Sequence, residues 1–249
     1  MRAMSTRPHA LHVSPPRPCP YLPGREESVV ATELAGAGAR RLYARGIRAG
    51  FRRSHNFMYR PACSGCDACR PVRVVIDDFE SSRSLERVRR VNRQVTAESG
   101  IAAATTEQFG VFQRYQADRH PGGGMDLMSF LEYRAMIEDS PIETFATEFR
   151  VAGGTLSALM LADVVADGLS AVYSFYDPAR PKLALGTYMI LWLIDETARR
   201  GLPYLYLGYW IEGCAKMDYK ARFRPLEAFG PEGWSAVDVE RGTGLREAV

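Results

Sequence analysis

The second half of the chain, from Ile142 onward, has an order of predicted elements that narrows the possible folds more than any other feature. Strands are predicted at residues 144–151, 156–165, 169–176 and 204–209. Gly153 and Gly154 fit a turn between the first two strands. Residues 185–199 have the apolar spacing of an amphipathic helix, which Gly201 is suited to end. Three strands, a helix and a further strand predict an α/β fold.

The first half of the chain is less regular, because prolines and glycines interrupt its patterns. An irregular arm is predicted at residues 1–25, where the closely spaced prolines are Pro15, Pro16, Pro18, Pro20 and Pro23. Helices are predicted at residues 26–48, 84–94, 106–119 and 126–139, with Ser84 as the N-cap of the second. A short β-branched strand is predicted at residues 72–76. We expect two domains, at residues 1–98 and 99–249.

The composition is that of an ordinary globular protein. The chain has 249 residues, of which 46% are hydrophobic and 24% charged. Residues 1–25 lack the apolar stretch of a secretory signal, and the run Met189–Ile194 is too short to span a bilayer. We therefore expect a cytoplasmic protein without membrane contact. The net charge of +3 restricts any nucleic-acid contact to a local basic patch, such as residues 40–93.

Three closely spaced cysteines, Cys63, Cys66 and Cys69, form a C-x2-C-x2-C run. Such thiolates can converge on one soft ion, and zinc and iron–sulfur clusters both use this chemistry with about four ligands. Cys19, which lies between two prolines, is the natural fourth ligand. The alternative is a set of reduced thiols without a metal. The remaining cysteine, Cys214, is expected to be an ordinary buried or half-buried thiol.

The predicted helix at residues 84–94 is rich in arginine. Arg83, Arg87 and Arg90 recur on one helical face, and Arg89 and Arg93 lie on the neighbouring strip. Forked guanidinium groups match phosphate oxygens, which indicates a binding surface for the backbone of an RNA. A merely solvated helix face is the alternative interpretation.

Several longer motifs are unusual enough to be compared with known families. In the first half they are Cys19–Pro23, Gly50–Ser54 and Tyr59–Cys63. In the second half they are Tyr173–Pro178, Leu185–Tyr188, Leu207–Ile211 and Lys216–Glu227. Together they resemble the motifs of bacterial aspartate/glutamate leucyltransferases, which are relatives of the eukaryotic arginyl-tRNA–protein transferases. The resemblance covers roughly residues 15 to 235.

The resemblance implies a GNAT-like acyltransferase domain that follows an N-terminal cysteine-bearing module. It implies leucyl-tRNA as the donor and a protein with an N-terminal Asp or Glu as the acceptor, so that the product has a destabilising N-terminus for regulated proteolysis. In the arginyl branch the cysteine region is associated with zinc or iron–sulfur binding, which the resemblance extends to Cys19, Cys63, Cys66 and Cys69. The choice of leucine over arginine rests on the branch resemblance alone.

The implied reaction is attack of an α-amine on an aminoacyl ester. The ester is already activated, so the chemistry needs no cofactor, ATP or covalent enzyme intermediate. The enzyme must orient the reactants, stabilise an oxyanion and accept a proton. Tyr176 and Asp177 are the candidate catalytic residues because they lie at the end of a predicted strand. An Asp before Pro178 is, however, also typical of a turn.

Cationic and aromatic residues are the candidates for binding the two substrates. A forked arginine is the best partner for the carboxylate of the acceptor. The predicted substrate-binding residues are Arg52, Arg53, His55, Tyr59, Lys216, Lys220 and Arg222. Tyr209, with Tyr206 and Trp210, offers aromatic faces on which the terminal adenine of the tRNA can stack. The alternatives are a solvated helix face for the late cations and core packing for the aromatic residues.

Two other functions fit part of the sequence. An acyl-CoA-dependent N-acyltransferase would need a glycine-rich turn around the pyrophosphate, but the turn at residues 180–187 has a single glycine and bulky neighbours. A non-catalytic zinc and tRNA-binding protein would explain the cysteines and the basic helix, but not the polar aromatic strands of the second half.

Overall fold

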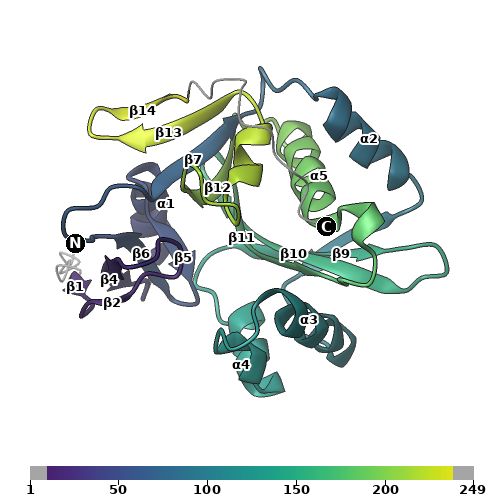
Figure 1. Ribbon diagram of the computed structural model, residues 1–249, viewed down its shortest axis with the longest axis horizontal. Coiled ribbons are helices and arrows are strands. Elements are labelled where there is room, and N and C mark those ends of the chain that lie inside the picture. Colours follow the sequence, from purple (N-terminus) through teal and green to yellow (C-terminus); the bar gives the residue numbers. More distant parts are fainter. Residues whose placement is uncertain (1–9, 238–249) are drawn as a thin grey trace, which may run out of the picture.

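Residues 10–237 are described in the computed structural model, and they contain two main β-sheets (Figure 1). The smaller sheet has the order β1-β4-β6-β5, with bounds His12–Val13 (β1), Val29–Glu33 (β4), Phe57–Pro61 (β6) and Arg52–Ser54 (β5). A separate two-stranded ribbon consists of β2 (Arg17–Pro18) and β3 (Glu26–Glu27). Helix α1 (Ala39–Arg48) packs its buried Tyr43 and Ile47 with Met58 of β6.

The larger sheet has eight strands in the order β14-β13-β7-β12-β11-β10-β9-β8. Their bounds are Gly233–Ala236 (β14), Leu226–Gly230 (β13), Arg70–Val75 (β7), Tyr204–Trp210 (β12), Gly168–Tyr176 (β11), Leu156–Val165 (β10), Thr144–Arg150 (β9) and Thr96–Ile101 (β8). Strands β11 and β12 are parallel, whereas the other neighbouring strands are antiparallel.

Helices cover both faces of the larger sheet (Figure 1). Their bounds are Arg83–Val91 (α2), Thr106–Arg119 (α3), Phe130–Glu138 (α4) and Leu185–Arg199 (α5), with short 3-10 segments at Met125–Leu127 (η1), Pro181–Leu183 (η2) and Asp218–Arg222 (η3). The α5 side has its own core, which includes Leu191 and Leu205. On the opposite side Phe112 of α3 and Tyr133 of α4 pack with Phe175 of β11. Within residues 10–237, no helix is both long enough and apolar enough to span a bilayer.

The predicted α/β arrangement of the second half is confirmed. Helix α5 covers the predicted residues 185–199, and Gly201 follows it with a positive φ of 66°. The three predicted strands before it are β9, β10 and β11, and the strand after it is β12. Local pattern was sufficient here because each element buries its apolar face in the same core.

Three predictions for the helices were wrong in part. Residues 26–48 begin with strands β3 and β4, because β4, with its β-branched Val29, Val30 and Thr32, pairs with β6, and α1 starts only at Ala39. Ser82, rather than Ser84, caps α2 through a hydrogen bond from the backbone N–H of Leu85. Helix α4 starts at Phe130 instead of residue 126, because Ser129 and Glu132 form a capping box there.

The larger sheet crosses the predicted domain boundary at residue 98. Strand β7 comes from the first half of the chain, yet it pairs with β12 on one side and β13 on the other. The small sheet and α1 also pack on the larger sheet, through Val165 and Tyr206. The division at residue 98 stays a prediction, and residues 1–9 of the predicted N-terminal arm lie outside the described part of the chain.

Candidate active site

The larger sheet opens between β11 and β12. These parallel strands pair only from Gly168 to Ser170 on β11, opposite Tyr204 to Tyr206 on β12. Beyond this point the register of each strand with its other neighbour shifts, near Val172 in β11 and near Leu207 in β12. Such bulges bend a strand and leave backbone groups without a ladder partner. The two strands therefore diverge and leave a split in the sheet.

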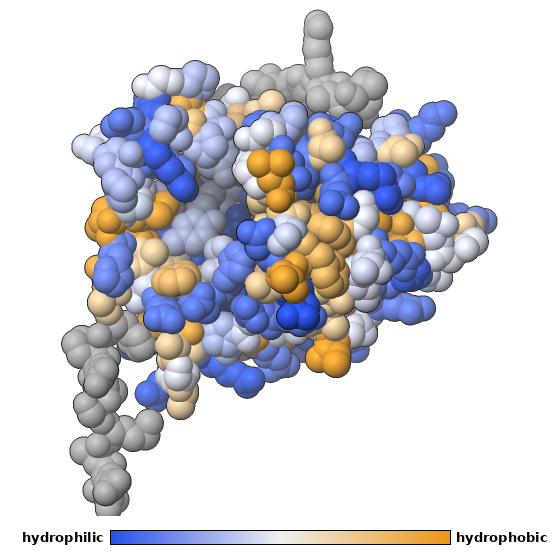
Figure 2. Space-filling model, turned by 90° about the horizontal axis from the view of Figure 1, so that it is seen from below, coloured by the Kyte–Doolittle hydropathy of each residue, from blue (hydrophilic) through white to orange (hydrophobic). Residues whose placement is uncertain are grey.

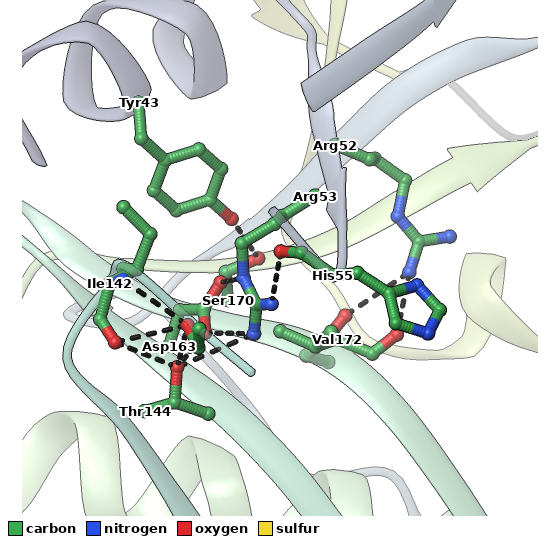
Figure 3. Close-up of polar contacts among 11 residues, drawn as sticks. Tyr43, Arg52, Arg53, His55, Ile142, Thr144, Asp163, Ser170 and Val172 are labelled. Carbon is green, nitrogen blue, oxygen red and sulfur yellow. Dashed lines mark hydrogen bonds and ion pairs between the residues drawn. The ribbon is translucent and has the colours of Figure 1, made fainter. Parts of the chain in front are cut away.

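The side chain of Arg52, from β5, lies in this split. Its Nη2 donates to the carbonyl oxygens of Ala171 and Val172 on β11, both at 3.2 Å (Figure 3). On the other side the guanidinium lies against Gly208 of β12, where an added Cβ would come within 2.3 Å of the Arg52 Cζ. Gly208 also has a φ of 74°, so both its conformation and this contact favour glycine. Arg52 thus satisfies backbone carbonyls that the split exposes.

Part of the Arg52 guanidinium has no partner among residues 10–237. Only Nη2 donates a hydrogen bond there, and no carboxylate lies within ion-pair distance of Arg52 in this part of the chain. The ring of Tyr209 lies 5.9 Å from the Arg52 Cζ. The Tyr59 ring packs on Tyr209 at 6.1 Å. A half-buried cation with an aromatic wall and an unused edge is suited to bind a carboxylate.

Lys220 lies beside Arg52 at the same split. The residue is 4% exposed, and its Nζ donates to the carbonyl oxygen of Tyr209 and lies 3.5 Å from the Met217 Sδ. Burial and the charge of Arg52 hold the pKa of Lys220 well below its ordinary range. The predicted residues Arg52, Tyr59, Tyr209 and Lys220 therefore meet at one place, although the first two come from the small sheet and the last two from the second half of the chain.

Arg53, the neighbour of Arg52 in the sequence, points elsewhere. Its Nε and Nη2 both bond Asp163 of β10 at 2.7 Å, and its Nη1 donates to the His55 carbonyl oxygen (Figure 3). Thr144 also donates to Asp163. Both charged side chains are almost fully buried. This pair joins the small sheet to the larger one and leaves little of Arg53 for a ligand.

Tyr176 and Asp177 lie at the far end of β11 from the paired segment. The Tyr176 ring packs edge-on against Tyr115 at 5.0 Å. Asp177 accepts a hydrogen bond from the backbone N–H of Ala179 and lies 3.8 Å from the Arg180 Nε, as a turn-forming residue does. Asp177 therefore has a local role in stabilising this turn, which competes with the catalytic role predicted for it.

A second group of residues, which the sequence analysis did not single out, adjoins Tyr176. His120, at the end of α3, packs edge-on against Tyr115 at 5.6 Å, and burial together with Lys216 and Arg119 lowers the pKa of His120. Burial raises the pKa of Tyr219, and the nearby Arg52 and Tyr176 shift it in opposite directions, so Tyr219 lies near both the split and this group. The only signal for Tyr219 was its place in the motif Lys216–Glu227, whereas no local pattern pointed to His120.

The remaining residues predicted to bind the substrates lie at several different places. Lys216 is exposed and faces His120, whereas Arg222 donates to the Ser84 hydroxyl at the start of α2, at 3.4 Å. His55 has a φ of 52° and lines a separate open pocket with Phe57. Tyr209 is 5% exposed and donates its hydroxyl to the carbonyl oxygens of Gly50 and Tyr59, so neither ring face is open for stacking on a base.

The face of the molecule seen from below is hollowed (Figure 2). The floor of this hollow has side chains of intermediate hydropathy, and its rim carries both hydrophilic and hydrophobic groups. Such a mixed surface is suited to a substrate with charged and apolar parts.

The arginines predicted to bind RNA separate into two groups. Arg83, Arg87, Arg90 and Arg93 are exposed, and none forms an ion pair within residues 10–237. Arg89 instead forms a two-pronged ion pair with Asp195 of α5 and thereby holds α2 on α5. Because Arg222 contacts Ser84, the basic surface of α2 adjoins the segment that carries Lys220.

The four predicted metal ligands lie in one region of the small sheet and its flanking loops. Burial, together with the nearby thiols of Cys19, Cys63 and Cys66, raises the pKa of the Cys69 thiol to about 12. Three of the four line a pocket of about 590 Å³ together with Arg60. No three His, Cys, Asp or Glu side chains are arranged as ligands of one ion in the described part of the chain. The donor set nevertheless has the chemistry that zinc and iron–sulfur clusters prefer.

Comparisons with known proteins bear on both halves of the chain. Residues 17–87 match the family model described as the N terminus of arginine-tRNA-protein transferase, and residues 107–230 match the corresponding C-terminal model. An aspartate/glutamate leucyltransferase of Paramagnetospirillum magneticum is 54% identical over 92% of this chain and 93% of its own length. One of Rhodospirillum rubrum is 53% identical over 95% of this chain and 96% of its own length.

A solved structure described as L-PGS from Bacillus licheniformis is also similar, at 15% identity and a TM-score of 0.45. The match covers 58% of this chain and 46% of that one. This likeness is too slight to support an inference about the present chain.

Proposed function

Because the chain belongs to the aspartate/glutamate leucyltransferase family, we propose that it transfers leucine from leucyl-tRNA to the N-terminal Asp or Glu of acceptor proteins. The chain is an aminoacyl-tRNA–protein transferase. We further propose that residues 99–249 form a GNAT-like domain behind the cysteine-bearing module, that the enzyme acts in the cytoplasm, and that its products are marked for degradation. The strand–strand–helix–strand order of β10, β11, α5 and β12 supports the GNAT-like assignment.

The observation that carries the proposal is the unpaired edge of Arg52 at the split. An acceptor that begins with Asp or Glu brings a side-chain carboxylate within a few ångströms of its α-amine. A half-buried guanidinium without a carboxylate partner binds such a group better than it binds the neutral side chain of Asn, Gln or Ala. In this proposal Arg52 sets the acceptor specificity, and the aromatic residues Tyr59 and Tyr219 form the walls around the terminal residue.

The chemistry requires positioning more than activation. The amine has an ordinary pKa of about 8, so a minority of it is neutral and nucleophilic at pH 7. Holding this amine next to the ester carbonyl supplies several kcal/mol of the rate enhancement, roughly 7–11 in the best cases. Backbone N–H groups at the bulges of β11 and β12 are candidates to stabilise the oxyanion, because bulges release such groups from the ladder.

The competing acyl-CoA function is disfavoured by the same geometry. Arg52 occupies the space between β11 and β12 and bonds the carbonyl groups of the split. An extended thiol cofactor that entered the split would have to displace this side chain and leave the carbonyls unpaired, at a cost of roughly 1–3 kcal/mol for each group.

We propose that the exposed arginines of α2 bind the phosphates of the donor tRNA. Replacing Arg83, Arg87 and Arg90 together with glutamine should weaken leucyl-tRNA binding about 10- to 100-fold at moderate salt. The slope of log Kd against log salt should fall by about 2–3, because each lost phosphate contact removes roughly 0.7–0.9 from it. The rate at saturating tRNA should stay within a few-fold of wild type.

The matched control is the triple Arg-to-Gln variant of the exposed residues Arg40, Arg41 and Arg45 on α1, which removes the same charge. If both triple variants lose equal affinity, a general charge effect explains the binding, and the assignment to α2 is wrong.

We propose that Cys19, Cys63, Cys66 and Cys69 hold a zinc ion or an iron–sulfur cluster. When bound, a metal with four thiolates stabilises the fold and takes no part in the transfer itself. The gathering of the four thiols around Cys69 supports this proposal.

Replacement of one proposed ligand, compared with replacement of Cys214, tests this proposal. Cys66→Ser should lower the thermal midpoint by several degrees and abolish the bound metal, whereas Cys214→Ser should change neither. Elemental analysis identifies zinc, and visible absorbance identifies an iron–sulfur cluster. If the purified wild type carries neither and Cys66→Ser is as stable as wild type, the cysteines are ordinary reduced thiols.

The proposed function is tested by incubating the protein with labelled leucyl-tRNA and peptides that begin with Asp, Glu, Lys or Ala. Label is expected on the first two peptides only. Equal labelling from arginyl-tRNA would make the donor assignment wrong. Binding of tRNA without transfer to any peptide would favour a non-catalytic tRNA-binding protein instead.

A further inference from the structure

Lys220 has surroundings that are unusual for a lysine. It is almost fully buried, and no carboxylate lies within ion-pair distance of its Nζ in the described part of the chain. Its only hydrogen-bond acceptors there are the Tyr209 carbonyl oxygen and the weak Met217 Sδ. An ammonium group taken out of water without an anionic partner is strongly disfavoured.

The charges that face Lys220 reinforce this effect. Arg52 packs against Gly208 of β12, which precedes Tyr209 in the chain. The positive charge of Arg52 opposes protonation of Lys220. The Tyr219 ring, 5.9 Å from the Nζ, and the thiol of Cys69 favour the charged form. The effect of Cys69 on the pKa of Lys220 is smaller than the opposing effects of burial and of Arg52. Since an arginine stays protonated at all ordinary pH values, Lys220 is the member of the pair that gives up its proton.

We propose that Lys220 is the proton acceptor for the transfer reaction, and that the carboxylate of the acceptor is bound by Arg52 alone. This inference rests on the proposed function and assigns Lys220 a role other than binding a carboxylate. A neutral amine at the split has a lone pair for a proton, whereas it lacks the charge that would hold an anion. Its place beside Arg52 puts it next to the acceptor terminus whose side chain Arg52 binds.

The proposed step balances without a further reactant. The lone pair of the α-amine forms a bond to the leucyl carbonyl carbon, and the proton from nitrogen passes to the Lys220 Nζ. The bond from this carbon to the ribose oxygen then breaks, and the Lys220 ammonium gives the proton to that oxygen. The products are a peptide bond and a tRNA with a free ribose hydroxyl, and Lys220 is neutral again.

Three substitutions at this position separate a base from a cation. Lys220→Arg supplies a permanent positive charge but cannot accept a proton, and Lys220→Met keeps the approximate shape without either property. Both should lower kcat about 10²- to 10⁴-fold, with the KM for leucyl-tRNA within a few-fold of wild type. Lys220→Ala should be similarly slow and should be restored by small primary amines in solution, more strongly by more basic amines. Lys182→Met, at an exposed lysine on η2, is the control and should have wild-type kcat.

The outcomes distinguish this inference from the proposed function. A wild type that transfers leucine while Lys220→Arg stays within about threefold of it would overturn the base role only. Failure of amines to restore Lys220→Ala would also overturn it. Variants that no longer bind leucyl-tRNA would assign Lys220 a structural role and contradict the inference. If the wild type transfers leucine to none of the acceptors, the proposed function itself is contradicted.

Discussion

Replacing Arg52 with methionine is expected to lower kcat/KM for an Asp-terminated peptide by at least about 100-fold. The guanidinium has two tasks, because it bonds the Ala171 and Val172 carbonyls and is proposed to bind the acceptor carboxylate. Removing one partner of a buried charged hydrogen bond costs roughly 2–5 kcal/mol, of which about 2.7 corresponds to 100-fold. The loss should lie mainly in the KM for the peptide, and transfer assays over a range of peptide concentrations measure it.

Two controls accompany this substitution. Arg45→Met, at an exposed arginine of α1, should keep wild-type activity. Arg52→Lys should recover only part of the loss, since a point charge cannot bond two carbonyl groups and a carboxylate in one plane. If Arg52→Met transfers leucine at the wild-type rate, the acceptor terminus lies elsewhere.

Asp163→Ala is expected to destabilise the protein by about 3–5 kcal/mol, because it leaves the buried Arg53 charge unpaired. The effect should appear in urea unfolding as a lower midpoint. The double variant Arg53→Met, Asp163→Leu should recover most of the loss, since it removes both buried charges together. Arg17→Met removes one partner of an exposed ion pair and should cost no more than about 1 kcal/mol. A loss below 1 kcal/mol for Asp163→Ala would show that Arg53 is solvated or has another partner.

The elements predicted well from the sequence are those whose pattern and end signals are local. Helix α5 combines an amphipathic spacing with Gly201, and the β9–β10 hairpin is marked by Gly153 and Gly154. Residues 26–48 were predicted as one helix, but their first part contains strand β4. This strand forms because it pairs with β6, which lies later in the chain and is not part of the local pattern.

The site could be predicted only in part, for a related reason. Arg52 and Arg53 are adjacent and chemically equal, so the sequence suggested the same role for both. On strand β5, however, successive side chains point to opposite faces. One therefore enters the split, and the other meets Asp163 on β10. The split itself depends on bulges in β11 and β12, which no local pattern reveals.

The most direct test of the central claim compares peptides that begin with Asp and with Asn, which differ only in the charge of one side chain. We expect the wild type to prefer Asp by about 100-fold or more in kcat/KM, and Arg52→Gln to reduce this ratio to near one. The ratio is independent of how much active enzyme each preparation contains. An unchanged preference in Arg52→Gln would contradict the account, because the acidic terminus would then be recognised by another part of the protein.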